Sequence, residues 1–237
     1  MGRRITLTEA GKEFLPYAKE IMDLCEKSKQ MLDSTDKMPA GKLTIGASES
    51  TMIYYLPEII RKYRKKYPKV TIVIKSLDYD LLNEQLKAGE IDVAVLLELS
   101  DWRMDHMLIN QWYTDQLLLV RSEHINKPLE ISMLVTEKNC SWRSLVDTYI
   151  LEQKKEDFKS IELPSVEATK RYSLSGLGKA MLPRFTIQKE IENSQLIVDK
   201  EVAPLGLYTA IHKDKWLPRN LEVFLELLEL ELSEIKP

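Results

Sequence analysis

Short apolar runs alternate with amphipathic segments along residues 42–97, and this alternation restricts the possible folds more than any other feature of the chain. The apolar runs, at residues 42–46, 70–75 and 92–97, have the length of β-strands. Between them, apolar side chains recur three and four positions apart, which predicts α-helices. The order is therefore βαβαβ, in which crossover helices join parallel strands and bring their ends to one side of the sheet. Proteins of the α/β class characteristically hold small molecules there.

Proline and glycine residues mark the ends of the two connecting helices. The first helix is expected near residues 56–67, with Pro57 in an early turn and Pro68 beyond its end. The second helix is expected at residues 78–87 and is stopped by Gly89. The sequence therefore predicts a first lobe with two helices between three strands.

The remaining chain predicts a second lobe and a return to the first. Further strands are expected at residues 107–111, 116–121, 160–163, 179–182 and 206–213. Further helices are expected at residues 141–153 and 165–173, after Pro183, and through Leu221, Leu225, Leu228, Leu232 and Ile235. Because the chain crosses twice between the lobes, we expect a cleft that opens and closes. The predicted lobes are residues 41–123 with 204–237, and residues 124–203.

Residues 1–40 read as the end of a strand followed by a long amphipathic helix. Thr6 or Thr8 is suited to cap this helix, and Glu9 follows Thr6 at the spacing of a capping box. A polar break with proline and glycine follows the helix and predicts a hinge. The helix has an apolar stripe that needs a partner, and we expect it to pair in a dimer. The residues expected in that contact are Phe14, Ala18, Ile21, Cys25 and Leu32.

Four segments together resemble the LysR-type transcriptional regulators. They are Leu7-Thr8-Glu9-Ala10-Gly11 at the start of the helix, and residues 41–46, 86–94 and 176–183 in the two lobes. The resemblance extends over essentially all 237 residues. It implies a regulatory domain similar to type 2 periplasmic binding proteins, with two Rossmann-like lobes, a central cleft and a long linker helix before them. It also implies a small effector between the lobes and a homodimer or homotetramer in the bacterial cytoplasm.

The same resemblance implies that this chain does not itself recognise DNA. In the family, a winged helix-turn-helix precedes the linker helix, and its recognition helix would lie before Arg3. We therefore expect specific DNA binding only through the N-terminal domain of a parent protein. With 34 Lys and Arg against 37 Asp and Glu, the net charge of −3 supplies no general attraction for nucleic acid.

Other compositional features favour a protein of the cytoplasm without a membrane partner. The longest apolar runs are only strand-sized, and no charged and then apolar leader opens the chain. Cys25 and Cys140 lie far apart and lack metal-ligand spacing, as expected in a reducing compartment.

Hydroxyl groups at the expected cleft favour a carboxylate-bearing effector. Ser48, Ser50 and Thr51 stand where the first strand turns into its helix, and hydroxyls with free N–H groups suit an anion. One of these residues is alternatively a simple helix cap. Glu49 disfavours an anion unless its side chain points away.

The second lobe has matching candidates at the start of its own helices. Thr136 and Ser141 offer hydroxyls, and Arg143 offers a guanidinium group suited to a carboxylate. The alternative is a helix cap followed by a surface arginine. Val166 and Glu167, at another expected helix start, are weaker candidates.

Two other functional classes explain less of the sequence than a regulator does. A solute-binding protein of a transporter would share the two-lobed cleft, but it would need an export signal and would have no use for the linker helix. An enzyme would need a nucleophile, a base or a metal cluster, and the sequence assembles no catalytic or metal-binding set and no cofactor motif. Cys140 beside a helix start is an alternative redox sensor, although a packed or pocket-lining thiol is the simpler interpretation.

Overall fold

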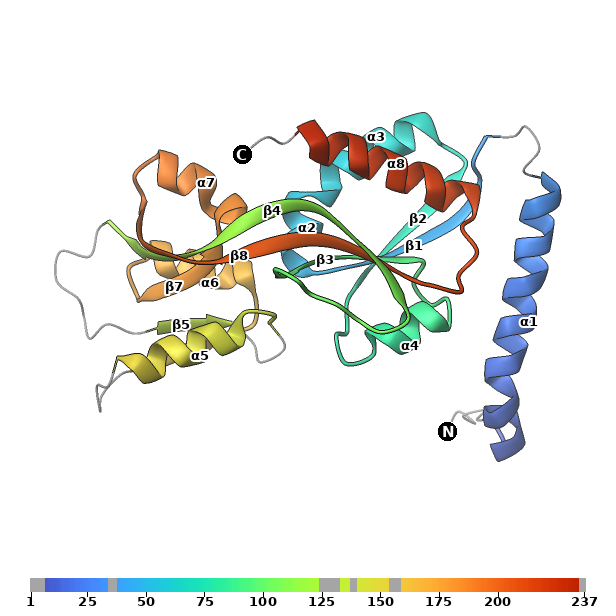
Figure 1. The fold of residues 1–237 in the computed structure, drawn as a ribbon, viewed down its shortest axis with the longest axis horizontal. Coiled ribbons are helices and arrows are strands. Elements are labelled where there is room, and N and C mark those ends of the chain that lie inside the picture. The colour runs from blue at the N-terminus through green and yellow to red at the C-terminus, as the bar shows by residue number, and fades with distance from the viewer. Residues whose placement is uncertain (1–6, 34–37, 124–132, 137–139, 154–158, 235–237) are drawn as a thin grey trace, which may run out of the picture.

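The described strands form one mixed sheet of eight strands, in the order β2-β1-β3-β8-β4-β7-β5-β6 (Figure 1). The computed structural model describes residues 7–33, 38–123, 133–136, 140–153 and 159–234. The strands are β1 Gly41–Ala47, β2 Val70–Ser76, β3 Val93–Leu99, β4 Met107–Ser122, β5 Met133–Thr136, β6 Ser160–Leu163, β7 Lys179–Pro183 and β8 Leu196–His212. The helices are α1 Glu9–Asp33, α2 Glu49–Tyr54, α3 Leu56–Lys66, α4 Leu82–Lys87, α5 Arg143–Glu152, α6 Val166–Leu174, α7 Arg184–Glu192 and α8 Arg219–Glu234. The predicted α/β class is therefore confirmed.

The first lobe contains the β2-β1-β3 end of the sheet with α2, α3, α4 and α8. As predicted, β1 pairs in parallel with both β2 and β3. The helix expected from residue 78 begins only at Leu82, because the Asp78 carboxylate first accepts the N–H groups of Asp80 and Leu81 in a turn. The short helix α2 is an addition to the prediction, and it comes directly after β1.

The second lobe contains the β7-β5-β6 end of the sheet with α5, α6 and α7. Strand β5 pairs in parallel with β6 and β7, and the helices lie within two residues of their expected positions. Gly176, with φ of 85°, ends the turn after α6, as expected for a tight helix-to-strand connection.

Two long antiparallel strands, β4 and β8, join the lobes by running through both (Figure 1). The two strands predicted at residues 107–111 and 116–121 are one strand with a register shift between Gln111 and Tyr113. The strand predicted at 206–213 is likewise only the second half of β8. Pro204 has no N–H to donate, yet it lies within the ladder opposite Gln116. The lobe boundary at 124 is outside the described residues and β8 is continuous through 204, so the boundaries stay predictions.

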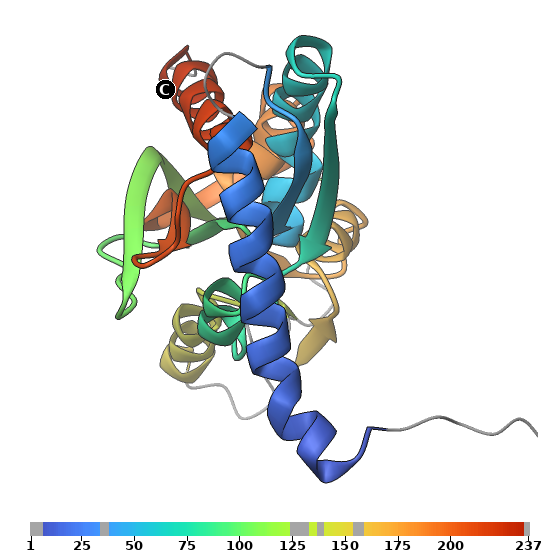
Figure 2. The same ribbon diagram turned by 90° about the vertical axis from the view of Figure 1, so that its right-hand side faces the viewer.

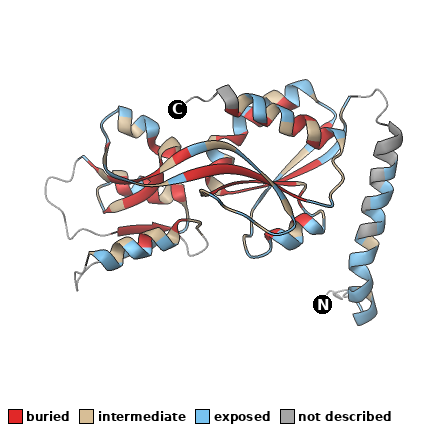
Figure 3. Ribbon diagram, in the orientation of Figure 1, coloured by how far each residue is buried: buried red, intermediate tan, exposed pale blue. Residues whose placement is uncertain are grey.

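A continuous apolar core lies along the sheet and extends into both lobes (Figure 3). Leu43 of the first lobe and Leu163 of the second belong to the same cluster. Burying each such side chain contributes about 1.5–3 kcal/mol. Helix α8 closes this core, where the Tyr63 hydroxyl donates to Asn220 O at 2.6 Å and the Asn220 amide donates to Lys42 O at 3.0 Å.

Helix α1 stands beside the lobes with most of its described side chains exposed (Figures 2 and 3). The Thr8 hydroxyl accepts the Gly11 N–H at 3.1 Å, so Thr8 is the cap, while Thr6 lies outside the described residues. Lys19 Nζ lies 3.2 Å from Glu90 Oε1 in the first lobe. Among the described helices, none is long and apolar enough to cross a membrane.

Candidate functional site

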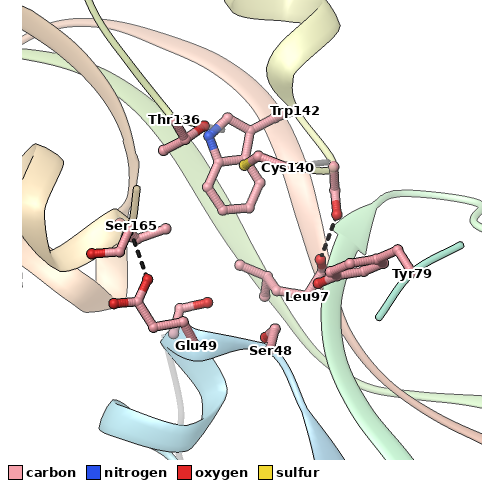
Figure 4. A pocket seen from close by; sticks show the side chains of 11 residues that line it. Ser48, Glu49, Tyr79, Leu97, Thr136, Cys140, Trp142 and Ser165 are labelled. Carbon is pink, nitrogen blue, oxygen red and sulfur yellow. Dashed lines mark hydrogen bonds between the residues drawn. The ribbon is translucent and has the colours of Figure 1, made fainter. Parts of the chain in front are cut away.

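A narrow pocket lies between the two lobes, with a volume of about 50 Å³ (Figure 4). This volume has room for roughly three or four water molecules. Its first-lobe wall comes from the β1–α2 junction, the segment before α4, and β3. Its second-lobe wall comes from the end of β5, the segment before α5 and the start of α6. The lining residues are Ser48, Glu49, Ser50, Tyr79, Leu97, Thr136, Cys140, Ser141, Trp142, Ser165 and Val166.

On the first-lobe wall, the predicted hydroxyl residues have different roles. Ser48 is the N-cap residue of α2, but its hydroxyl meets the Thr51 hydroxyl at 3.0 Å instead of a backbone N–H. Thr51 is fully buried, with its hydroxyl oxygen 2.9 Å from Ser48 O and from Val95 O, and it does not line the pocket. Ser48 and Ser50 do line it, so the structure brings two of the three residues to the pocket.

On the second-lobe wall, two buried polar atoms lack partners. Thr136 Oγ1 and Trp142 Nε1 make no hydrogen bond within the described structure, although both residues are only 3% exposed. Leaving such a group unpaired costs about 1–3 kcal/mol. An indole N–H can only donate, whereas a threonine hydroxyl can donate or accept. These two buried atoms of the second-lobe wall therefore have hydrogen-bonding capacity that the described residues leave unused.

Arg143 does not line the pocket, although the sequence made it a candidate. Its guanidinium group donates to the Asp147 carboxylate at 2.8 Å, to Thr136 O at 2.6 Å and to the Glu162 carboxylate at 3.2 Å. These contacts hold the side chain within the second lobe. In this conformation the Arg143 side chain does not reach the pocket, so its contact with an effector stays a prediction.

Ser141 lines the pocket and bridges the two lobes. Its hydroxyl donates to Leu97 O of β3 at 3.2 Å (Figure 4). Next to Leu97, Glu98 is only 8% exposed, and burial raises the pKa of this carboxyl to about 7. Burial also raises the pKa of Tyr79, so its hydroxyl is protonated at neutral pH. The Glu98 carboxyl next to the pocket is thus largely removed from water.

Glu49 crosses from the first lobe to the start of α6. Its Oε2 atom accepts the Val166 N–H at 2.8 Å (Figure 4). Ser165 caps the same helix by accepting the Ala168 N–H at 3.1 Å. The amino end of α6 carries partial positive charge, which Glu49 offsets. Glu49 therefore points toward the second lobe and remains at the pocket.

A second contact between the lobes involves Tyr54 at the end of α2. Its hydroxyl donates to Glu167 Oε2 at 2.6 Å and accepts from Lys170 Nζ at 2.9 Å. Lys170 is buried and also donates to Thr186 O and pairs with Glu190, each at 2.9 Å. Of the two α6 candidates, Val166 lines the pocket, whereas Glu167 belongs to this contact with Tyr54.

Several lining residues were not predicted from the sequence. Tyr79 lies in a loop expected to be helical, and Leu97 belongs to a buried strand. Trp142 stands between the two predicted residues Ser141 and Arg143, and that position was the one available indication. Cys140 lines the pocket, in agreement with the simpler of its two interpretations. In the described part of the chain, no three His, Cys, Asp or Glu side chains gather as a metal site would require.

Two lobes joined by long strands, with a pocket between them, define a small-molecule-binding domain. The family model for the LysR substrate binding domain matches residues 36–232. The chain therefore belongs to the LysR family of transcriptional regulators.

Relatives and solved structures agree with this assignment. The chain is 31% identical to the uncharacterized HTH-type transcriptional regulator YwqM of Bacillus subtilis strain 168, over 96% of this chain and 81% of the relative. It is 27% identical to the uncharacterized HTH-type regulator YfiE of Escherichia coli K12, over 97% and 81%. Its fold is similar to the apo regulatory domain of HypT from Salmonella typhimurium, with a TM-score of 0.70, 20% identity and coverage of 85% and 100%.

Proposed function

We propose that this chain is the effector-sensing and oligomerisation region of a cytoplasmic LysR-type regulator. In this proposal, a small carboxylate-bearing metabolite binds between the lobes and controls DNA binding and transcription by the full-length protein. The parent protein contacts DNA through its N-terminal domain, and the assembly is a homodimer or homotetramer. The proposal assigns no enzymatic activity, cofactor or membrane partner to the chain.

The unpaired atoms Thr136 Oγ1 and Trp142 Nε1 carry this proposal. A ligand carboxylate accepts hydrogen bonds from both, and it relieves the cost of burying them unpaired. The nearby hydroxyl of Ser50 adds a further donor at the same pocket, whereas the Ser141 hydroxyl already donates to Leu97 O. The small volume favours a compact ligand or the polar end of a larger one.

Contacts to both lobes give the ligand its regulatory effect. A ligand held by Ser50 on one side and Trp142 on the other binds the closed arrangement better than an open one. It therefore shifts the population toward closure by as much as its affinities for the two states differ. We expect that shift to reach the linker helix and, through it, the DNA-binding part of the dimer.

A thermal-shift screen of small cellular metabolites, followed by calorimetry, tests the proposal. A ligand present at about 100 times its dissociation constant adds roughly 2.7 kcal/mol to the free energy of unfolding. We expect Trp142→Phe and Thr136→Val each to weaken binding by about three- to tenfold for a neutral hydrogen bond, and more for a charged ligand group.

Two further variants make the result specific to this pocket. Thr148→Val, on the exposed side of α5, is the matched control for Thr136→Val and is expected to bind as wild type. Arg143→Ala tests the predicted guanidinium contact in the same assay. Full affinity in both Trp142→Phe and Thr136→Val, with the fold intact, would place the effector elsewhere.

A further inference from the structure

The two walls of the pocket have opposite hydrogen-bonding character. On the second-lobe wall, Trp142 Nε1 is a donor without a partner and cannot accept. On the first-lobe wall, the Glu49 carboxylate can only accept when ionised. Both side chains line the same pocket from opposite lobes (Figure 4). A ligand that fits both walls presents an acceptor at one end and a donor at the other.

Glu49 already occupies the position where α6 would attract an anion. Its Oε2 accepts the Val166 N–H at 2.8 Å, at the amino end of a nine-residue helix. A carboxylate from outside therefore meets a carboxylate there instead of free N–H groups. The unpaired donors, Trp142 Nε1 and Thr136 Oγ1, leave the opposite wall as the place for a ligand carboxylate.

The charge of the pocket supports the same orientation. Among the described lining residues, Glu49 is the one carboxylate, and there is no Lys, Arg or His. A ligand that brings only negative charge is repelled by Glu49, whereas a protonated amine beside Glu49 forms a charge-assisted hydrogen bond.

We infer that Glu49 determines the class of ligand, and that the pocket takes a small zwitterion. Its protonated amine lies beside Glu49, and its carboxylate lies against Trp142 and Thr136. The inference rests on the proposed function, because it assigns the chemistry of the effector at that same pocket.

Three matched sets of compounds test the inference on the whole chain. They are the protein L-amino acids, the 2-hydroxy acids with the same side chains, and the primary amines with the same side chains. The first set presents both ends, the second lacks the amine and the third lacks the carboxylate. We expect an amino acid to raise the melting temperature and to bind at least tenfold more tightly in calorimetry than its hydroxy-acid and amine counterparts.

Glu49→Gln removes the charge while retaining an amide oxygen that can accept the Val166 N–H. In this variant we expect the affinity for the amino acid to fall about ten- to a hundredfold. The affinity for the matching 2-hydroxy acid is expected to rise, because the repulsion is gone. Glu58→Gln, in an exposed pair with Arg61 on α3, is the control and is expected to leave both affinities unchanged.

The outcomes separate this inference from the proposed function. A 2-hydroxy acid that binds wild type as tightly as its amino acid, and loses affinity in Trp142→Phe, overturns the zwitterion while supporting the effector pocket. Unchanged amino-acid affinity in Glu49→Gln also overturns it. Binding by none of the three sets overturns it as well, and the metabolite screen then decides the proposed function separately.

Discussion

At the scale of single residues, Glu98 is the buried acid with the clearest consequence for stability. It follows Leu97 on β3 and is 8% exposed. Burial disfavours the charged carboxylate and raises its pKa from 4.5 to about 7, although a hydrogen bond with Ser141 opposes this shift. The folded protein therefore keeps a proton on Glu98 at pH values where the unfolded chain has released it.

This raised pKa predicts that stability declines with rising pH. Between about pH 4.5 and pH 7 the folded state binds more protons than the unfolded state, so the free energy of unfolding falls across that window and then levels off. Glu98→Gln removes the penalty. We expect this variant to gain up to about 3 kcal/mol over wild type at pH 8 and much less at pH 4.5, as measured by urea unfolding.

Because other acids are also buried, the test compares the free energy of unfolding of Glu98→Gln with that of wild type at each pH. Burial raises the pKa of Asp115 to about 6, which acts in the same direction in both proteins and cancels between them. Glu58→Gln removes an exposed carboxylate whose pKa is lowered by its hydrogen bond with Arg61, so it is expected to lose slightly more stability at pH 8 than at pH 4.5, opposite in sign to Glu98→Gln. If the gain from Glu98→Gln were equal at pH 4.5 and pH 8, this account of Glu98 would be wrong.

At the scale of elements, α1 exposes an apolar surface that the other described parts of the chain do not cover. Phe14, Tyr17, Ile21, Met22 and Leu24 are each more than half exposed. Burying such side chains against a partner removes apolar area from water, which stabilises the assembly by about 25 cal/mol per Å² of buried area. Of the residues predicted in the dimer, Cys25 is also exposed and Ala18 partly so, whereas the Leu32 side chain lies outside the described residues.

We predict that the chain forms a dimer or a higher oligomer through this surface of α1. Ile21→Glu places a charge within it and is expected to shift the assembly toward monomer by at least tenfold in dissociation constant. Sedimentation velocity across micromolar concentrations measures the shift.

The control for α1 is Lys12→Gln, which changes an exposed polar side chain of the same helix. It is expected to sediment as wild type. A wild-type chain that stays monomeric at high micromolar concentration, with no response to Ile21→Glu, would contradict the predicted role of α1.

At the scale of the whole molecule, α2 connects the two lobes. Glu49 at its start binds the Val166 N–H, and Tyr54 at its end binds Glu167 and Lys170. The Tyr54 and Phe185 rings also pack edge to face, with centroids 5.6 Å apart. This arrangement of the lobes thus has its own contacts, to which the proposed effector would add.

Tyr54→Phe tests how much these contacts hold the lobes together. The variant keeps the ring but loses one hydrogen bond to an acid and one from an amine, so we expect the free energy of unfolding to fall by about 1–3 kcal/mol. Amide hydrogen exchange is expected to accelerate at the start of α6 and in α7.

Tyr172→Phe is the matched control, because Tyr172 lies on α6 with its side chain 43% exposed. We expect it to change stability by less than about 0.5 kcal/mol. Unchanged stability and exchange in Tyr54→Phe would mean that its hydroxyl contributes nothing to lobe closure.

Much of this fold could be predicted from the sequence because its elements are specified locally. The βαβαβ series follows from the spacing of apolar residues, and the Thr8 cap and the Gly176 turn follow from residue type. The errors occurred where tertiary contacts decide. Strand β8 continues through Pro204 because pairing with β4 holds both sides of that residue, and α4 starts late because Asp78 binds the preceding N–H groups.

Part of the candidate site could likewise be predicted from the sequence, and part could not. The sequence by itself determined that hydroxyls stand at Ser48, Ser50, Thr136 and Ser141, because strand ends and helix starts fall there. Only the tertiary structure decided that Arg143 turns to Asp147 and Glu162, that Trp142 keeps a free N–H, and that Glu49 reaches α6. Residue spacing specifies local structure, whereas the partner of a side chain is specified by segments that meet only when the lobes fold together.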